Sequence, residues 1–139
     1  MHKQRRRILL CAYACRPHAG SEPMMGWAAY QALRKRHDVR VFTSESGRES
    51  IGAAIKQGEG HEEDFVFVRE RWRFVDRPAA DKLISWLNTF HFQRNLAKLA
   101  RPVIEQFQPE VIHQVTIGTW RAGNSLVGRG IPCLLYTSD

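Results

Sequence analysis

Short apolar runs alternate with longer segments of mixed polarity along the whole chain. The runs are rich in aliphatic residues, which is typical of buried parallel strands, and the segments between them carry apolar residues at helical spacing. This alternation predicts an α/β fold, in which a Rossmann-like parallel sheet has helices on both faces. The expected strands are Ile8–Tyr13, Val39–Thr43, Phe65–Arg69, Val111–Val115 and one that begins at Ile131.

The segments between the strands predict the helices. We expect helices over Pro23–Arg36, Glu49–Gln57 and Asp81–Phe107, and a short one near Ala122–Arg129. Pro102 is expected to kink or divide the longest helix, because proline lacks an N–H and clashes with the preceding turn. Its apolar stripes and aromatic residues are expected to face the core, with a membrane surface as the alternative for the aromatics. These residues are Leu83, Leu87, Phe90, Leu96, Leu99, Val103 and Phe107, together with Trp86 and Phe92.

Charge is concentrated at the start of the chain. The length of 139 residues is that of one domain, and the formal net charge is +7, to which Lys3, Arg5, Arg6 and Arg7 contribute four. The simplest interpretation of this basic arm, residues 1–7, is a solvated segment. A contact with anionic lipid and nucleic-acid binding are the alternatives. No RRM, KH, zinc-finger or helix-turn-helix signature is present, so nucleic acid is not an expected partner.

Cysteine content and hydropathy favour a reducing, cytoplasmic setting. Three cysteines do not make an even disulfide set, and no apolar run approaches membrane-spanning length. The spacing of Cys11, Cys15 and His18 matches no standard zinc pattern, so we expect no metal. A secretory or lipidated leader over Met1–Ala14 is an alternative. However, the apolar run Ile8–Cys15 is at the short limit for such a leader and is equally typical of a central strand.

A glycine loop joins the first strand to the first helix. Residues Cys15–Trp27 read Cys-Arg-Pro-His-Ala-Gly-Ser-Glu-Pro-Met-Met-Gly-Trp. Gly20 and Gly26 let the backbone approach a ligand closely, and Pro23 suits the first helical turn. The free N–H groups of the helix start would then face a sugar or a phosphate. The spacing matches neither the dinucleotide fingerprint nor a P-loop, and a plain glycine turn is the alternative.

A second polar segment follows the fourth strand. His113 and Thr116 lie near the expected strand end and Arg121 near the next helix start, where they suit contacts to hydroxyls and phosphates. Ligands of parallel sheets bind at the carboxyl ends of the strands, so we expect this segment and the glycine loop at one edge. The alternative for His113 is a hydrogen-bonded core histidine.

Both segments resemble family-4 glycosyltransferases of the GT-B fold. In that family a Cys-x-Pro-x-x-Gly-Ser-Glu-Pro-x-x-Gly-Trp run follows the first strand, and an acidic residue and two apolar ones precede His-His-Val-Thr and then a Trp/Tyr-Arg pair. This chain has Glu110-Val-Ile-His-Gln-Val-Thr116 and Trp120-Arg121, with Gln114 in place of the second histidine. His37–Thr43 and Gly130–Pro132 also resemble the family, so the resemblance covers both ends of residues 8–132.

The resemblance implies a function for residues 8–132. They would form the N-terminal, acceptor-side half of a retaining glycosyltransferase of the hexosyltransferase type. That enzyme would move a sugar from a nucleotide-sugar to a hydroxyl of a glycan or lipid-linked acceptor, in polysaccharide or glycolipid biosynthesis, with no metal or other cofactor. A weaker hypothesis places it peripherally at the inner face of the plasma membrane. His113 would be the catalytic residue, and Gly20, Ser21, Glu22, Gly26, Trp27, Thr116 and Arg121 would bind substrate.

The family's C-terminal half binds the nucleotide-sugar and carries two glutamates eight positions apart. No such half is present, so we expect this fragment alone to be inactive. Residues Cys133–Asp139 match one reading frame of a common transposon-derived sequencing adapter, so we expect a natural chain that continues past Pro132. The alternatives are a genuine fifth strand, and a stand-alone Rossmann-like module that binds a sugar or phosphate ligand without catalysis.

Overall fold

The chain folds around one parallel sheet. The computed structural model describes residues 3–69, 81–116, 126 and 128–135. Within them the strands are β1 (Arg7–Ala12), β2 (Asp38–Ser44), β3 (Phe65–Val68), β4 (Val111–Thr116) and β5 (Cys133–Leu135). Their order is β3-β2-β1-β4-β5, and every neighbouring pair is parallel. The predicted α/β, Rossmann-like fold is confirmed.

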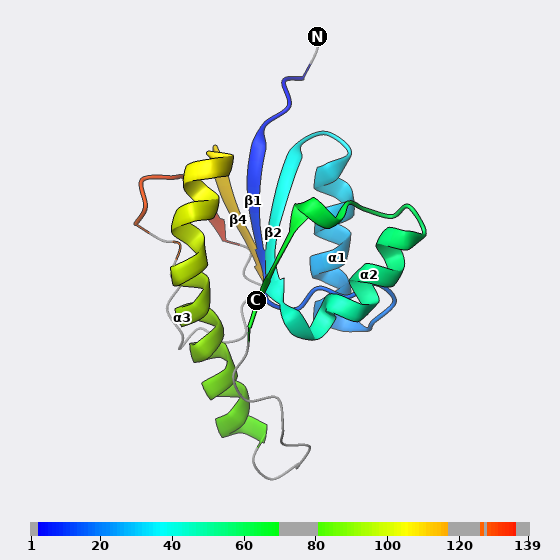
Figure 1. Ribbon diagram of the computed structural model, residues 1–139, viewed down its shortest axis with the longest axis vertical. Helices are drawn as coiled ribbons and strands as arrows, with labels where there is room; N and C mark the ends of the chain where they lie inside the picture. The colour runs from blue at the N-terminus through cyan, green and yellow to red at the C-terminus, as the bar shows by residue number, and fades with distance from the viewer. Residues whose placement is uncertain (1–2, 70–80, 117–125, 127, 136–139) are drawn as a thin grey trace.

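Helices cover both faces of the sheet, as predicted. Figure 1 shows α1 (Ser21–Arg34) and α2 (Arg48–Lys56) on one face and α3 (Asp81–Phe107) on the other. Two short 3-10 turns, η1 (Glu45–Gly47) and η2 (Glu62–Asp64), precede α2 and β3 and were not predicted. The observed bounds of α1, α2 and the first four strands differ from the predicted ones by one or two residues.

Strand β1 is the centre of the core because both of its faces are buried. Leu10 and Ala12 belong to an apolar cluster with α1 and α2, whereas Leu9 and Cys11 belong to a cluster with α3. Successive side chains of a strand point to opposite faces, so a strand covered on both sides must be apolar throughout. The uninterrupted apolar run that predicted this strand therefore reflects its central position.

Helix α3 is one helix that runs through Pro102, so it is not divided at this residue, and the kink predicted as the other outcome stays a prediction. Pro102 lies on the exposed side of the helix. There its missing N–H removes one hydrogen bond of a 27-residue helix, and no core packing depends on it.

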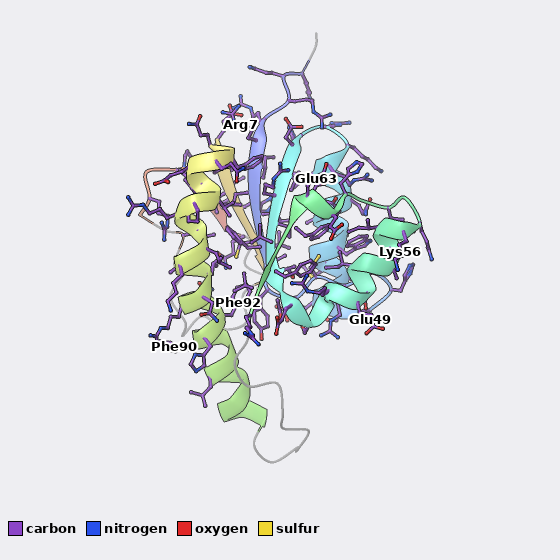
Figure 2. All side chains as sticks on the ribbon, viewed as in Figure 1. Arg7, Glu49, Lys56, Glu63, Phe90 and Phe92 are labelled. Carbon is purple, nitrogen blue, oxygen red and sulfur yellow. The ribbon has the colours of Figure 1, made fainter. Side chains whose placement is uncertain are left out.

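The face of α3 that packs on the sheet carries Phe92, Leu96 and Ala100, all buried. Phe90 is 49% exposed and Leu99 is 36% exposed, so their predicted core positions are wrong. Figure 2 shows Phe92 on the sheet side of α3 and Phe90 on the opposite side. Residues four apart share a helix face, and Ala100 continues the face of Phe92 and Leu96.

Two sequence predictions fall outside the described residues. These are most of the helix predicted near Ala122–Arg129 and the core positions of the Leu83 and Trp86 side chains; residues 70–80 are also outside them. Strand β5 lies within the segment expected to derive from an adapter, and its Leu134 is 57% exposed. The origin of that segment stays a prediction.

Gly26 fixes the distance between α1 and the end of β1. It is buried, and a methyl group at this position would overlap the carbonyl oxygen of Ala14. A Gly26→Ala substitution should therefore lower the free energy of unfolding by about 1–3 kcal/mol, as overpacking does. Gly52→Ala in α2 is the matched control, because a methyl group there meets no atom within 4 Å.

In this control, better helix propensity should stabilise the protein by about 0.5–1 kcal/mol. Urea unfolding of both variants measures the difference. Equal effects of the two substitutions would contradict the assigned role of Gly26.

Candidate functional site

The candidate site lies at the carboxyl edge of the sheet, between β1 and β4. From β1 the chain adds β2 and β3 on one side and β4 and β5 on the other, so the strand order reverses here. Open α/β sheets bind ligands outside the carboxyl ends of the strands at such a point. The β1–β4 register also shifts between Cys11 and Ala12, so that Ala12 pairs with Thr116. The ladder is therefore irregular at the edge where a ligand would lie.

The loop after β1 is held by backbone hydrogen bonds at both ends. The carbonyl of Tyr13 accepts from the N–H of Ser44 at 3.1 Å and from the hydroxyl of Thr43 at 3.3 Å. The N–H of Arg16 donates to the carbonyl of Pro23 at 3.0 Å. His18, with φ at 61°, occupies the left-handed region, which costs a non-glycine residue about 1–3 kcal/mol. The loop therefore has a defined shape that links β1, β2 and α1.

The start of α1 presents donors and one acceptor to the solvent. Gly20 is the N-cap residue and makes no side-chain cap hydrogen bond, so it leaves the orphan N–H groups of the first turn available. Gly20, Ser21 and Glu22 are all exposed. Hydroxyl groups both donate and accept, so N–H groups beside the Glu22 carboxylate suit a ligand rich in hydroxyls.

Gly26 and Trp27 lie beneath this surface. Gly26 packs against Ala14, and Trp27 is 5% exposed. The Trp27 ring is stacked at 6.2 Å from the ring of Phe65 and lies 5.4 Å from the ring of Tyr30. Both residues position α1 on the sheet, and neither presents a side chain at the exposed start of the helix.

His113 lies within β4 rather than at its end. It is the third residue of the strand and pairs in register with Leu10 on one side and Leu134 on the other. Because Ile112 packs on the α3 side, the alternation of the strand places His113 on the face covered by α1. The strand continues for three residues, roughly 10 Å, beyond it. Its side chain is half-buried, and this burial lowers the pKa of the imidazole.

The remaining residues of the second segment are only partly described. Thr116 ends β4 beside Ala12, at the same edge as the glycine loop. Arg121 and Trp120 lie outside the described residues. The structure thus brings Gly20–Glu22 and the backbone of Thr116 to one edge and leaves His113 deeper in the sheet.

Arg16 and Ser46 also lie at this edge, although no sequence pattern marked them. Arg16 Nη2 donates to Ser46 Oγ at 3.0 Å. Ser46 Oγ lies 2.9 Å from Ser44 Oγ, which in turn accepts from the N–H of Ser46 at 3.2 Å. The sequence feature that could have identified them is their position, because both polar residues come just after the apolar runs of β1 and β2.

A cavity of about 420 Å³ lies at the opposite, amino edge of the sheet. Four of its charged groups form two ion pairs: Arg5 pairs with Asp38 at 3.1 Å, and Arg40 pairs with Asp64 at 3.3 Å. The Arg40 guanidinium also lies 4.9 Å from the centre of the Phe107 ring. We regard this cavity as structural, because these interactions occupy the groups that would otherwise bind a ligand. Its lining comprises Arg5, Arg34, His37, Asp38, Val39, Arg40, His61, Glu63, Asp64 and Phe107.

The basic arm binds this amino edge. Arg5 Nη2 donates to the carbonyl of His37 at 3.0 Å, and Arg7 Nε donates to the carbonyl of Gln108 at 2.8 Å. These carbonyls follow the C-terminal ends of α1 and α3, where orphan carbonyls and the helix dipole favour a cation. Arg5 and Arg7 are nevertheless exposed, which agrees with the solvated segment that the sequence predicts.

The cysteines of the core offer no nucleophile. Cys11 and Cys15 are buried, and burial raises the pKa of each thiol to about 12, so both are protonated at neutral pH. In the described part of the chain, no three His, Cys, Asp or Glu side chains gather in a way that could hold a metal ion.

Comparisons with known proteins give no relative. No protein-family model matches the chain, and searches of curated proteins and of solved structures return no significant match. No helix among residues 3–69 and 81–116 is long and apolar enough to cross a membrane.

The lowered pKa of His113 predicts a loss of stability in mild acid. Near pH 6.5 the unfolded chain binds a proton at this imidazole that the folded chain does not. The contribution to stability is therefore present above pH 6.5 and is lost as the pH falls toward the lower folded-state pKa. Between pH 7.5 and 5.5, the free energy of unfolding should fall less in His113→Gln than in the wild type.

Urea unfolding at both pH values measures this difference. His18→Gln, which removes an exposed imidazole from the loop after β1, is the control. If His113→Gln shows the same pH dependence as the wild type, desolvation of His113 does not affect stability.

Proposed function

We propose that residues 8–132 are the acceptor-side half of a retaining glycosyltransferase that moves a sugar from a nucleotide-sugar to an acceptor hydroxyl. One observation carries the proposal: the Gly-Ser-Glu-Pro-x-x-Gly-Trp pattern, which resembles family-4 glycosyltransferases, forms the loop and helix start at the switch point of the sheet. The position where the fold favours a ligand and the position of the family's loop coincide.

The chemistry of the loop supports a sugar as the ligand. Gly20 leaves N–H donors at the start of α1, and the Glu22 carboxylate adds an acceptor beside them. A hydroxyl-rich acceptor satisfies both kinds of group. Because His113 lies three residues before the end of β4, the sugar site proposed here does not include its side chain.

The exposure of Gly20 and Glu22 also fits the second candidate function. This is a stand-alone module that binds a sugar or phosphate ligand and carries out no transfer. Both functions place the ligand on the same loop. They differ in whether the natural chain includes a half that binds the nucleotide-sugar.

Glu22→Gln tests the sugar site. We expect glucose, mannose, galactose or N-acetylglucosamine, titrated as methyl glycosides, to shift the NMR amide signals of residues 16–26. Glu22→Gln should weaken the binding about tenfold, because a hydrogen bond to a charged group contributes about 1.5–3 kcal/mol. Glu49→Gln is the matched control: Glu49 is also an exposed acid in the first turn of a helix, and Figure 2 shows it at the start of α2.

The same samples test transfer. With UDP-glucose or GDP-mannose added, mass spectrometry should detect no glycosylated acceptor, because the donor half is missing. Transfer by this chain would contradict the assignment to one half of the enzyme. If none of the four glycosides shifts the loop signals, or if Glu22→Gln and Glu49→Gln weaken binding equally, the sugar site is refuted.

A further inference from the structure

The guanidinium of Arg16 bridges the ends of β1 and β2. Its Nη2 donates to Ser46 Oγ at 3.0 Å, and its backbone N–H donates to the carbonyl of Pro23. Ser46 is in turn tied to Ser44, the last residue of β2. Arg16 is thus held both at its backbone and at the tip of its long, exposed side chain. Binding a ligand would therefore cost less conformational entropy.

Gly47 allows Arg16 to lie close to the turn after β2. A Cβ atom at position 47 would lie 2.7 Å from the carbonyl oxygen of Cys15 and 3.5 Å from Cγ of Arg16. The first of these separations is shorter than real Cβ atoms show, so only glycine fits without a shift. The Arg16 stem therefore packs over Gly47, which directs the guanidinium toward Ser46.

Among the described residues, Arg16 has no acidic partner. Within the described part of the chain, the ion pairs are Arg5–Asp38, Arg40–Asp64 and Arg101–Glu105. Arg16 uses one N–H on a neutral hydroxyl, which leaves four of its five side-chain donors for another acceptor. At the amino edge, in contrast, Arg5 and Arg7 donate to carbonyls or carboxylates of the chain itself.

We infer that Arg16 and Ser46 form a phosphate-binding subsite next to the sugar site at the start of α1. A guanidinium fork with an adjacent hydroxyl matches the oxygens of a phosphate group. This inference rests on the proposed function. The acceptor is then a phosphorylated sugar, which binds with its sugar at Gly20–Glu22 and its phosphate at Arg16.

Inorganic phosphate is the first probe. Titrated at constant ionic strength with chloride as the balancing anion, it should give saturable NMR shifts at the amides of Arg16, Ser46 and Gly47. Arg16→Gln should weaken this binding about tenfold, because the hydrogen bonds lost are charge-assisted. Ser46→Ala, which removes one neutral hydroxyl, should weaken it about threefold.

Arg36→Gln is the matched control. Arg36 is exposed and follows α1 at the opposite edge of the sheet, so the substitution changes the net charge equally. It should alter phosphate affinity less than twofold. Amide signal dispersion of each variant confirms folding before titration. Absence of saturable shifts, or equal losses in Arg16→Gln and Arg36→Gln, would overturn the inference.

Mannose 1-phosphate and methyl mannoside separate this inference from the proposed function. If the phosphosugar binds more tightly than the glycoside and Arg16→Gln removes the difference, the subsite is supported. If glycosides bind at the loop but phosphate adds no affinity, the subsite alone fails. If phosphate binds at Arg16 and no sugar binds the loop, the subsite stands and the proposed acceptor function fails.

Discussion

Burial of β1 on both faces is the constraint on which the rest of the structure depends. Its residues from Leu9 to Ala12 are fully buried, and each large aliphatic side chain contributes about 1.5–3 kcal/mol when removed from water. That burial requires α1 and α2 on one face and α3 on the other, and it requires β2 and β4 to pair with both edges of the strand. The loop after β1 therefore begins between the neighbouring strands β2 and β4, at the switch point of the sheet.

The two edges of the sheet differ in how their polar groups are satisfied. At the amino edge, Arg5 and Arg7 bind carbonyls that follow α1 and α3, and Arg5 and Arg40 pair with carboxylates. At the carboxyl edge, Gly20 is the N-cap residue of α1 and makes no side-chain hydrogen bond. The amino edge is thus internally paired, whereas the carboxyl edge has donors left for a ligand. This contrast is the physical reason to place function beside Gly20 and Arg16 rather than in the cavity at the other end.

The fold could be predicted because its strands and helices follow from local patterns in the sequence. Continuous apolar runs mark strands that are covered on both faces, and the bounds of the longest helix, Asp81–Phe107, were predicted correctly. On the side of that helix that packs, Phe92 and Leu96 were predicted correctly, whereas Phe90 and Leu99 were not and Ala100 was overlooked. The contacts of Arg16 with Ser46 and of Arg7 with Gln108 join residues 30 and 101 positions apart, so no local pattern could show them.

The measurement that tests the central claim most directly is to sequence the source DNA beyond the codon for Pro132. If residues 8–132 are the acceptor-side half of a glycosyltransferase, the reading frame continues in place of Cys133–Asp139. It should pass into a second α/β half with two glutamates eight positions apart. A frame that ends at Asp139 in the source DNA would contradict the enzyme assignment and favour a small module that binds a sugar or phosphate ligand without transfer.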